Sequence, residues 1–213
     1  MILMYHKVDL IAPTMWWVTP RALRRQLREL DGREFVHLDD YDSPATQVVL
    51  TFDDAYENVA RHAVPALRRA GVPFEVFVIG GRIGAWNDDD ASEPLTRFMS
   101  LGHLDRVVEA GGRLQWHSRT HRDLPTLDDA ELATELTVQP RLRERYAAPH
   151  FTWLSYPSGA HDERVVKATR ERFGGAVSVI EGRPDDRWQL NRVTVEEGTS
   201  FATPYRSAQE VGA

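Results

Sequence analysis

The chain has 213 residues, of which 42% are hydrophobic and 27% charged, and its formal net charge is -6. This length and composition suit one globular domain and leave little room for two. The acidic balance and the lack of a basic stripe argue against a nucleic-acid partner, and the absence of cysteine excludes disulfides and thiolate metal sites. Any transition-metal site must therefore use His, Asp or Glu.

No apolar run is long enough to span a bilayer. Met1 leads into a short strand-like segment, without a basic n-region or a long apolar h-region, so we expect no signal peptide. If Met1 is the natural start, we expect a cytoplasmic protein; if the natural chain begins earlier, an exported one stays open. We expect residues 1–213 to form one domain with a loosely held tail from about residue 202.

Short apolar runs predict strands along the chain. Ile2–Tyr5 reads as a buried strand that ends at His6, and residues 48–52 as a buried strand that ends at Asp53 and Asp54. Further strands are expected over residues 35–38, 74–79, 113–117, 151–156, 176–180 and 192–195.

Helices are expected between these strands. Thr19-Pro20 predicts a helix start, because Thr is a favoured N-cap and Pro a favoured first helical residue, and Gly32 closes that helix. A helical stripe over residues 59–70 contains Pro65, which predicts a kink or a restart. Other helices are expected over residues 101–110, 128–146 with an interruption at Pro140, and 165–173, and a long polar loop over 80–94.

The alternation of strands and helices predicts an α/β fold of parallel βαβ units. Chemistry in such folds gathers at the carboxyl ends of the strands. Several polar residues directly follow predicted strands: His6, Asp53, Asp54, His117 and the turn at residues 157–159. We therefore expect these residues to converge on one face, although they are spread over most of the chain.

Asp53 and Asp54 stand side by side at the end of a buried strand. Desolvated carboxylates need a counter-ion or a metal, and successive residues at a strand end point in different directions. The pair can therefore divide the work, with one acid binding a metal and the other free as a base. The alternative is that both acids cap the following helix.

His117 and His121 form an H-x3-H pair, whose spacing in a loop lets the chain wrap around one ion. Imidazole with carboxylate is a ligand set of the zinc type. Together with Asp54 the pair would give three protein ligands and an open position for water or substrate. The alternative is two surface or capping histidines, since a chain with eight histidines produces some close pairs.

Three motifs in chain order resemble those of the polysaccharide deacetylase family, also called the NodB homology domain or carbohydrate esterase family 4. TFDDAY at residues 51–56 resembles the first motif, HSRTH at 117–121 the second and LSYPSG at 154–159 the third. The opening ILMYHKV resembles the poly-N-acetylglucosamine deacetylase branch, whose catalytic histidine stands near the N-terminus. The resemblance runs from residue 2 to about 195 and implies one catalytic domain, a distorted (β/α) barrel with parallel strands.

The resemblance also implies roles for individual residues. Asp53 matches the general base and His6 the general acid, the backbone N–H of Ser158 matches the oxyanion donor, and Arg192 matches an arginine that orients or charges the base. It implies one divalent metal ion, with zinc as first choice and cobalt, nickel or iron as alternatives. The matching metal ligands are Asp54, His117 and His121.

Four positions depart from the family pattern, and they bear on the substrate more than on the reaction. Ala55 replaces the usual glycine, whose backbone freedom it lacks. Trp116 stands where small residues are usual, and we expect it to pack in the interior. Ser158 replaces an aromatic wall of the pocket, and Ser155 replaces an arginine that pairs with the base in many members, which leaves Arg192 as its substitute.

Five further residues are candidates for substrate contact. Aromatic faces stack on sugar rings, although aromatic side chains also pack locally. The candidates are Trp16, Trp17 and Trp86 in predicted loops, and Tyr156 and Pro157 in the third motif.

The function implied by the resemblance is a metal-dependent hydrolase that removes N-acetyl groups from an amino sugar, oligosaccharide or polysaccharide such as poly-N-acetylglucosamine. One alternative keeps the fold and changes the substrate, to an O-acetyl ester or a non-sugar amide. The other is a catalytically silent module that binds a glycan or a partner protein.

Overall fold

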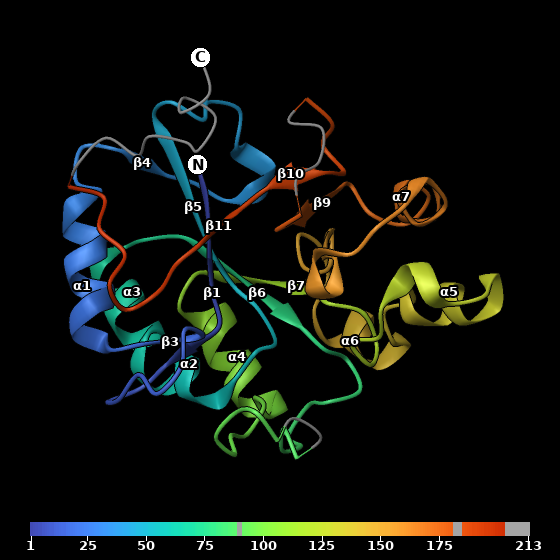
Figure 1. Cartoon of the computed structure of the whole chain (residues 1–213), viewed down its shortest axis with the longest axis horizontal. Helices are drawn as coiled ribbons and strands as arrows, with labels where there is room; N and C mark the ends of the chain where they lie inside the picture. Colours follow the sequence, from blue (N-terminus) through green and yellow to red (C-terminus); the bar gives the residue numbers. More distant parts are fainter. Residues whose placement is uncertain (89–90, 181–184, 203–213) are drawn as a thin grey trace.

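The structure, a computed structural model, describes residues 1–88, 91–180 and 185–202 (Figure 1). The loosely held tail expected from about residue 202 falls almost entirely outside these ranges. None of the helices within them is long and apolar enough to cross a membrane.

A parallel sheet of nine strands forms the centre of the fold (Figure 1). The strands are β1 (Ile2–Tyr5), β4 (Glu34–Phe35), β5 (Gln47–Phe52), β6 (Phe74–Val78), β7 (Gly112–Trp116), β8 (Trp153–Ser155), β9 (Gly175–Ser178), β10 (Leu190–Asn191) and β11 (Val193–Thr194). The hydrogen-bonded order is β10-β9-β8-β7-β6-β5-β1-β11, and β4 also pairs with β5. A separate parallel pair consists of β2 (Lys7–Val8) and β3 (Trp17–Val18).

The two ends of the sheet are brought together by one short stretch of chain. β10 pairs with β9, β11 pairs with β1, and a single residue, Arg192, separates β10 from β11. The Arg192 N–H donates to the Ser178 carbonyl at 2.9 Å, and the Val195 N–H donates to the Met4 carbonyl at 2.9 Å. The sheet is thereby nearly closed into a barrel, and Arg192 lies at its seam.

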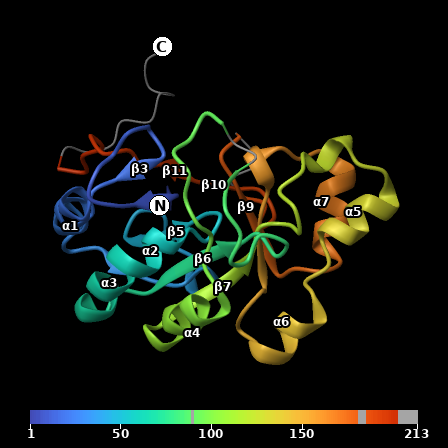
Figure 2. The ribbon, with the colours of Figure 1, turned by 90° about the horizontal axis from the view of Figure 1, so that it is seen from below.

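The helices lie outside the barrel. In Figure 2, α1 to α4 group on one side of it and α5 to α7 on the other. Their bounds are α1 (Pro20–Glu29), α2 (Glu57–His62), α3 (Val64–Ala70), α4 (Leu101–Glu109), α5 (Asp129–Glu135), α6 (Pro140–Arg145) and α7 (Glu163–Arg170). Within the described ranges, 3-10 turns occur at Leu38–Asp40, Leu124–Thr126 and Pro157–Gly159.

Alternate residues of the strands pack on opposite faces of the sheet, as the period of a strand requires. On β5, Val48, Leu50 and Phe52 belong to the large core cluster that includes residues of the helices. Val49 belongs instead to a smaller cluster with side chains of other strands, such as Phe77. The barrel therefore has an interior core of its own. Because side chains alternate along a strand, Val49, Thr51 and Asp53 lie on the same face of β5 and its extension.

The predicted alternation of strands and helices is confirmed, and so is the restart of the helix near Pro65, which is the second residue of α3. The interruption expected at Pro140 in the helix over residues 128–146 is confirmed, but it is wider than expected, because α5 ends at Glu135 and α6 begins only at Pro140. The Glu135 carbonyl accepts a hydrogen bond from the Trp116 indole at 2.9 Å. The indole is a partner from outside the helix. In addition, Pro140 disfavours helical geometry in the residue that precedes it.

Two smaller expectations are also corrected. The strand expected over residues 35–38 is formed only by Glu34–Phe35, because the Leu38 N–H donates to the buried Glu75 carboxylate at 3.0 Å and begins a 3-10 turn. Trp17, expected in a loop, lies in β3, where it pairs with Lys7. Neither feature is longer than a few residues, so neither leaves a periodic signal in the sequence.

Candidate active site

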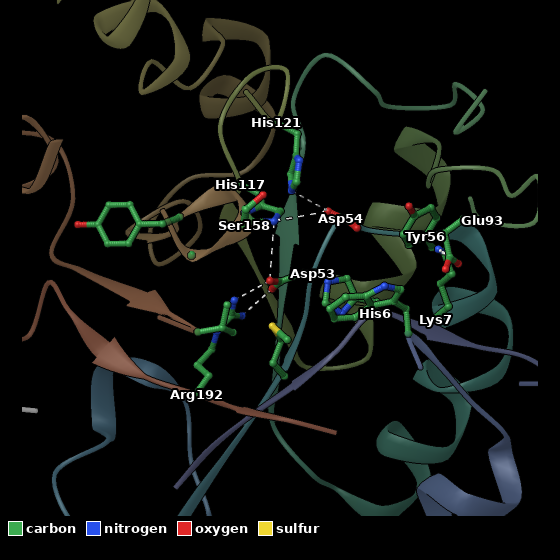
Figure 3. A pocket seen from close by; sticks show the side chains of 15 residues that line it. His6, Lys7, Asp53, Asp54, Tyr56, Glu93, His117, His121, Ser158 and Arg192 are labelled. Atoms are coloured by element: carbon green, nitrogen blue, oxygen red, sulfur yellow. Dashed lines mark hydrogen bonds and ion pairs between the residues drawn. The ribbon is translucent and has the colours of Figure 1, made fainter. Parts of the chain in front are cut away.

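The residues that follow the strands converge on one pocket of about 390 Å³. His6 follows β1, Asp53 and Asp54 follow β5, and His117 follows β7. Figure 3 shows them facing a common centre, with Arg192 beside Asp53. The convergence that the strand pattern predicts is therefore present in the structure.

Asp53 and Arg192 form a buried, two-pronged ion pair. Each terminal nitrogen of Arg192 lies 2.6 Å from one Asp53 carboxylate oxygen, and the second of these nitrogens also donates to the Ser155 hydroxyl at 2.8 Å. The Ser155 hydroxyl in turn donates to Asp53 at 3.2 Å. Burial alone would raise the pKa of Asp53, but the charge and hydrogen bonds of Arg192, together with the charges of His117 and His6, outweigh it and hold the pKa far below the usual range. Asp53 is therefore an ionised carboxylate in a fixed orientation.

Asp54, His117 and His121 bring one carboxylate oxygen and two imidazole nitrogens within 4.8 Å of one another. Asp54 Oδ1 lies 3.5 Å from His117 Nε2 and 3.7 Å from His121 Nε2, and it is buried without a hydrogen-bond partner among the described residues. A buried polar atom without a partner is rare and needs an explanation.

The second nitrogen of His117 shows why a cation fits here. His117 Nδ1 lies 2.8 Å from the Ser155 carbonyl, which can only accept, so Nδ1 carries the proton. Burial lowers the pKa of His117 to about 4, so the ring is neutral at neutral pH. Its Nε2 is then an acceptor that faces the Asp54 carboxylate, and a metal ion between the two removes this conflict. The residues present fit a divalent metal of the zinc type.

Glu135, which the sequence analysis did not identify, organises the loop that carries His121. Its buried carboxylate accepts hydrogen bonds from the N–H groups of Arg119 and Thr120 at 2.9 and 2.8 Å, and from the Thr120 hydroxyl at 2.5 Å. The residue lies in a polar helical stretch, so the sequence gives no signal of this role.

Strained backbone is concentrated at the site. Apart from Phe151, all non-glycine residues with positive φ in the described ranges lie in its loops: Asp54, Ala55, Ser118, His121 and Ser158. Ala55 has φ of 60°, so it keeps the left-handed conformation that the usual glycine would adopt without strain. Such strain persists where the surrounding structure over-determines it, and it is common at active sites.

His6 lies on the opposite side of Asp54 from the two other histidines (Figure 3). The Trp16 ring packs against it, with ring centroids 4.7 Å apart. Burial lowers the pKa of His6, although the Asp54 and Asp53 charges oppose this shift. His6 and Trp16 both line the pocket.

The third motif forms a tight turn at the pocket. Ser158 and Tyr156 line the pocket, whereas Pro157 is buried in the turn and does not line the pocket. The Tyr156 hydroxyl donates to the Trp188 carbonyl at 2.9 Å. Tyr156 therefore offers its ring rather than its hydroxyl to the pocket.

The two remaining tryptophan candidates lie elsewhere. Trp17 is buried, and its indole N–H donates to Glu93 at 2.8 Å. Trp86 is 46% exposed and lines a separate hollow. Trp116 is fully buried, as expected.

Lys7 and Glu93 form a wall of the pocket that the sequence analysis missed. Their ion pair is 2.7 Å long and almost fully buried, and the Lys7 ammonium also lies 4.4 Å from the centre of the Tyr56 ring. The position of Lys7 directly after His6 was the only available signal, because Glu93 lies in a loop of polar residues.

Comparison with known proteins bears on the identity of the site. Residues 40–172 match the polysaccharide deacetylase family. The Bacillus subtilis (strain 168) protein named "Putative polysaccharide deacetylase YxkH" is 25% identical over 158 residues, which are 72% of this chain and 53% of that protein. The chain thus spans about half the length of this curated relative.

Solved structures resemble the whole fold. Streptococcus pyogenes deacetylase PplD, in complex with acetate, superposes with a TM-score of 0.77 at 23% identity, covering 94% of this chain and 93% of that one. A de-N-acetylase from Aggregatibacter actinomycetemcomitans gives a TM-score of 0.74 at 14% identity, covering 94% and 96%. At these identities the likeness establishes the fold.

Proposed function

The chain belongs to the polysaccharide deacetylase family, and from that premise we propose that it is a metal-dependent hydrolase of N-acetylated amino sugars. The substrate would be N-acetylglucosamine in an oligosaccharide or polysaccharide, and the products acetate and the free amine. The de-N-acetylase among the similar folds supports the choice of an amide over an ester.

The observation that carries the proposal is the contrast between the two adjacent aspartates. Both carboxylate oxygens of Asp53 are held by Arg192, and one of them also accepts from Ser155, whereas an oxygen of Asp54 faces two imidazoles and has no hydrogen-bond partner among the described residues. One acid is thus kept charged and oriented, and the other is left for a cation. A silent binding module has no physical need for this division.

The protein groups have separate tasks in the proposed reaction. Asp54, His117 and His121 would hold a divalent ion, with zinc as first choice, which supplies Lewis acidity toward the acetyl carbonyl and a more acidic water. Asp53, which stays ionised, would accept the proton of the attacking water. The backbone N–H of Ser158, on the pocket lining, would donate to the developing oxyanion.

The leaving amine needs a proton, and His6 would donate it. Because burial lowers the pKa of His6, the ring must take up a proton before the carbon–nitrogen bond breaks. Proton transfer of this kind contributes typically about 10²–10⁴ in rate.

The test is acetate release from N-acetylglucosamine oligomers in the presence of zinc, cobalt or nickel. We expect release by the wild type, and loss of release with a chelator and in Asp53→Asn. Asp105→Asn is the matched control, because Asp105 also binds an arginine with both oxygens, but on the surface. Release that is unaffected by Asp53→Asn would refute the assignment of the base.

Tight metal binding without acetate release from any N-acetyl sugar would support the assignment of the metal site and contradict the assignment of the substrate. The same assay on O-acetylated sugars would then identify the esterase alternative.

A further inference from the structure

Glu93 connects the two strands of the small parallel sheet beside His6. Lys7 and Trp17 are partners in the register of β2 and β3. One carboxylate oxygen of Glu93 accepts from the Lys7 ammonium at 2.7 Å and also from the Trp17 indole N–H at 2.8 Å. We propose that Glu93 is a positioning residue, which holds the His6 ring in place for its proton transfer by clamping this pair.

The small sheet provides little backbone structure of its own. β2 and β3 have two residues each, and an isolated pair of strands is at best marginally stable in water. The Lys7 N–H donates to the Trp16 carbonyl at 3.0 Å. Glu93 comes from a different segment, between β6 and α4, and adds a charged link to this pairing. Because the Lys7 and Glu93 side chains are 3% and 6% exposed, salt weakens the link little.

The position of the His6 ring depends on these two strands. Among the described residues, neither ring nitrogen of His6 has a hydrogen-bond partner, and the ring packs against Trp16 with centroids 4.7 Å apart. His6 directly precedes Lys7 at the start of β2, and Trp16 directly precedes Trp17 at the start of β3. Both rings are therefore placed by the two residues that Glu93 binds, so loss of the clamp leaves both free to shift.

Lys7 extends the clamp to the first motif. Its ammonium lies 4.4 Å from the centre of the Tyr56 ring, and Tyr56 follows Asp54 by two residues. Both Lys7 and Tyr56 line the pocket. In Figure 3 these two residues lie with Glu93 on the His6 side of the pocket. The clamp thus ties the wall that carries the proton donor to the loop that carries a proposed metal ligand.

This inference rests on the proposed function for the role of His6, so its test includes one readout that needs no activity. The His6 ring resonances are measured by NMR on protein that carries isotope-labelled histidine, with zinc present, and are assigned by their loss in His6→Ala. In Glu93→Ala we expect them to shift, because the ring senses the ring current of the Trp16 indole. The His117 resonances should stay in place. Movement of both sets would indicate a general loss of structure and overturn the inference.

The kinetics of acetate release from N-acetylglucosamine oligomers measure the catalytic consequence. In Glu93→Ala we expect kcat to fall by about 10²-fold, since a misplacement of about 1 Å can cost this much, whereas KM should stay within about twofold. Glu93→Gln keeps an oxygen for both donors and should restore part of kcat. Trp17→Phe removes one donor but keeps a ring, so it should cause a smaller loss. This variant serves for both readouts if Glu93→Ala does not fold.

Glu29→Ala is the matched control. Glu29 also accepts from two groups, the Phe201 N–H at 2.7 Å and the Ser200 hydroxyl at 3.0 Å, but it lies outside the pocket. It should leave kcat, KM and the His6 resonances unchanged. Unmoved His6 resonances in Glu93→Ala, or a loss of kcat that Glu29→Ala matches, would overturn the inference. A wild type that releases no acetate would refute the proposed function, whereas a shift of the His6 resonances would still support Glu93 as the positioning residue.

Discussion

Arg192 holds the Asp53 carboxylate with both terminal nitrogens, each 2.6 Å from one oxygen, although the two residues are 139 positions apart in the chain. Both side chains are buried, at 1% and 3% exposure. The planar guanidinium fixes the carboxylate in orientation as well as in charge. Because Arg192 lies between β10 and β11, the closure of the barrel and the placement of the base depend on the same residue.

The first prediction concerns the stability that this pair provides. Arg192→Met leaves the Asp53 charge buried without its partner, so we expect the free energy of unfolding to fall by about 3–5 kcal/mol. Arg145→Met is the matched control, because Arg145 also binds both oxygens of an aspartate, Asp105, through Nε and one terminal nitrogen, but at 47% and 32% exposure, and its loss should cost at most about 1 kcal/mol. Urea unfolding measures both values. Equal losses would contradict the importance of burial.

The second prediction concerns Glu93, which ties the loop before α4 to the segment after His6. Glu93→Gln leaves the Lys7 ammonium buried without a counter-charge, at 3% exposure, and we expect a loss of about 3 kcal/mol in stability. Glu144→Gln, at an exposed glutamate, should change stability by at most about 0.5 kcal/mol.

The stability that the Lys7–Glu93 ion pair provides should depend on pH. Burial would raise the pKa of Glu93, but hydrogen bonds from Lys7, Thr14 and Trp17 outweigh it and lower the pKa below the ordinary 4.5. A lowered pKa means that the folded state binds the proton less readily, so the stabilisation is present above pH 4.5 and is lost as the pH falls through the folded value. The difference between wild type and Glu93→Gln should therefore shrink in acid. A constant difference from pH 7 to pH 3 would disprove this.

The third prediction concerns the metal. A ligand at 1,000 times its dissociation constant stabilises by about 4 kcal/mol, and each kcal/mol raises Tm by about 2–4 °C in a chain of this size. Zinc should thus raise Tm by about 8–16 °C, and EDTA should reverse the shift. Asp54→Asn should abolish it, whereas Asp31→Asn, at an exposed aspartate, should not. A zinc shift that survives in Asp54→Asn would place the metal elsewhere.

The fourth prediction concerns Glu135, which touches no proposed ligand directly. Glu135→Gln removes the charge that three donors of residues 119 and 120 share, so the loop before His121 loses its anchor. We expect zinc affinity to fall about 10- to 100-fold. Competition with a chromophoric chelator measures this, with Glu144→Gln, at an exposed glutamate of α6, as control. Unchanged affinity together with lowered stability would show that Glu135 serves the fold alone.

The sequence predicted the strand ends of the site well, because His6, Asp53 and His117 each follow a buried apolar run whose end is easy to locate. It also suggested the Asp54–His117–His121 cluster, since parallel strands bring their carboxyl ends together. The contact of Arg192 with Asp53 could be inferred only from the resemblance, and the contacts of Glu135 could not be inferred at all. They join segments far apart in the chain, and no local pattern records which distant carboxylate a given arginine or N–H will meet.

Short and irregular features were the least predictable. β3 has two residues, and the break before Pro140 begins as early as Glu135, whose carbonyl binds the Trp116 indole. Glu93 lies in a stretch of polar residues that would ordinarily be solvated, and its burial is decided by Lys7 and Trp17. In each case a tertiary partner determines the local structure, and the partner is not visible in the sequence of the segment itself.

The last prediction separates the two chemistries open to this site. An amine is a poor leaving group without a proton, whereas an alcohol depends less on protonation, so a proton donor matters more for amide than for ester hydrolysis. His6→Ala should therefore reduce acetate release from N-acetylglucosamine oligomers by about 10²–10⁴-fold, and should reduce release from an O-acetyl sugar by much less. Trp16→Phe, which keeps a ring against His6, controls for the loss of packing at this wall. If both substrates lost the same factor in His6→Ala, the residue would act by holding the pocket in shape rather than by donating a proton. If the ester were the only substrate hydrolysed, the pocket would belong to an esterase, and the division of labour between Asp53 and Asp54 would serve that reaction instead.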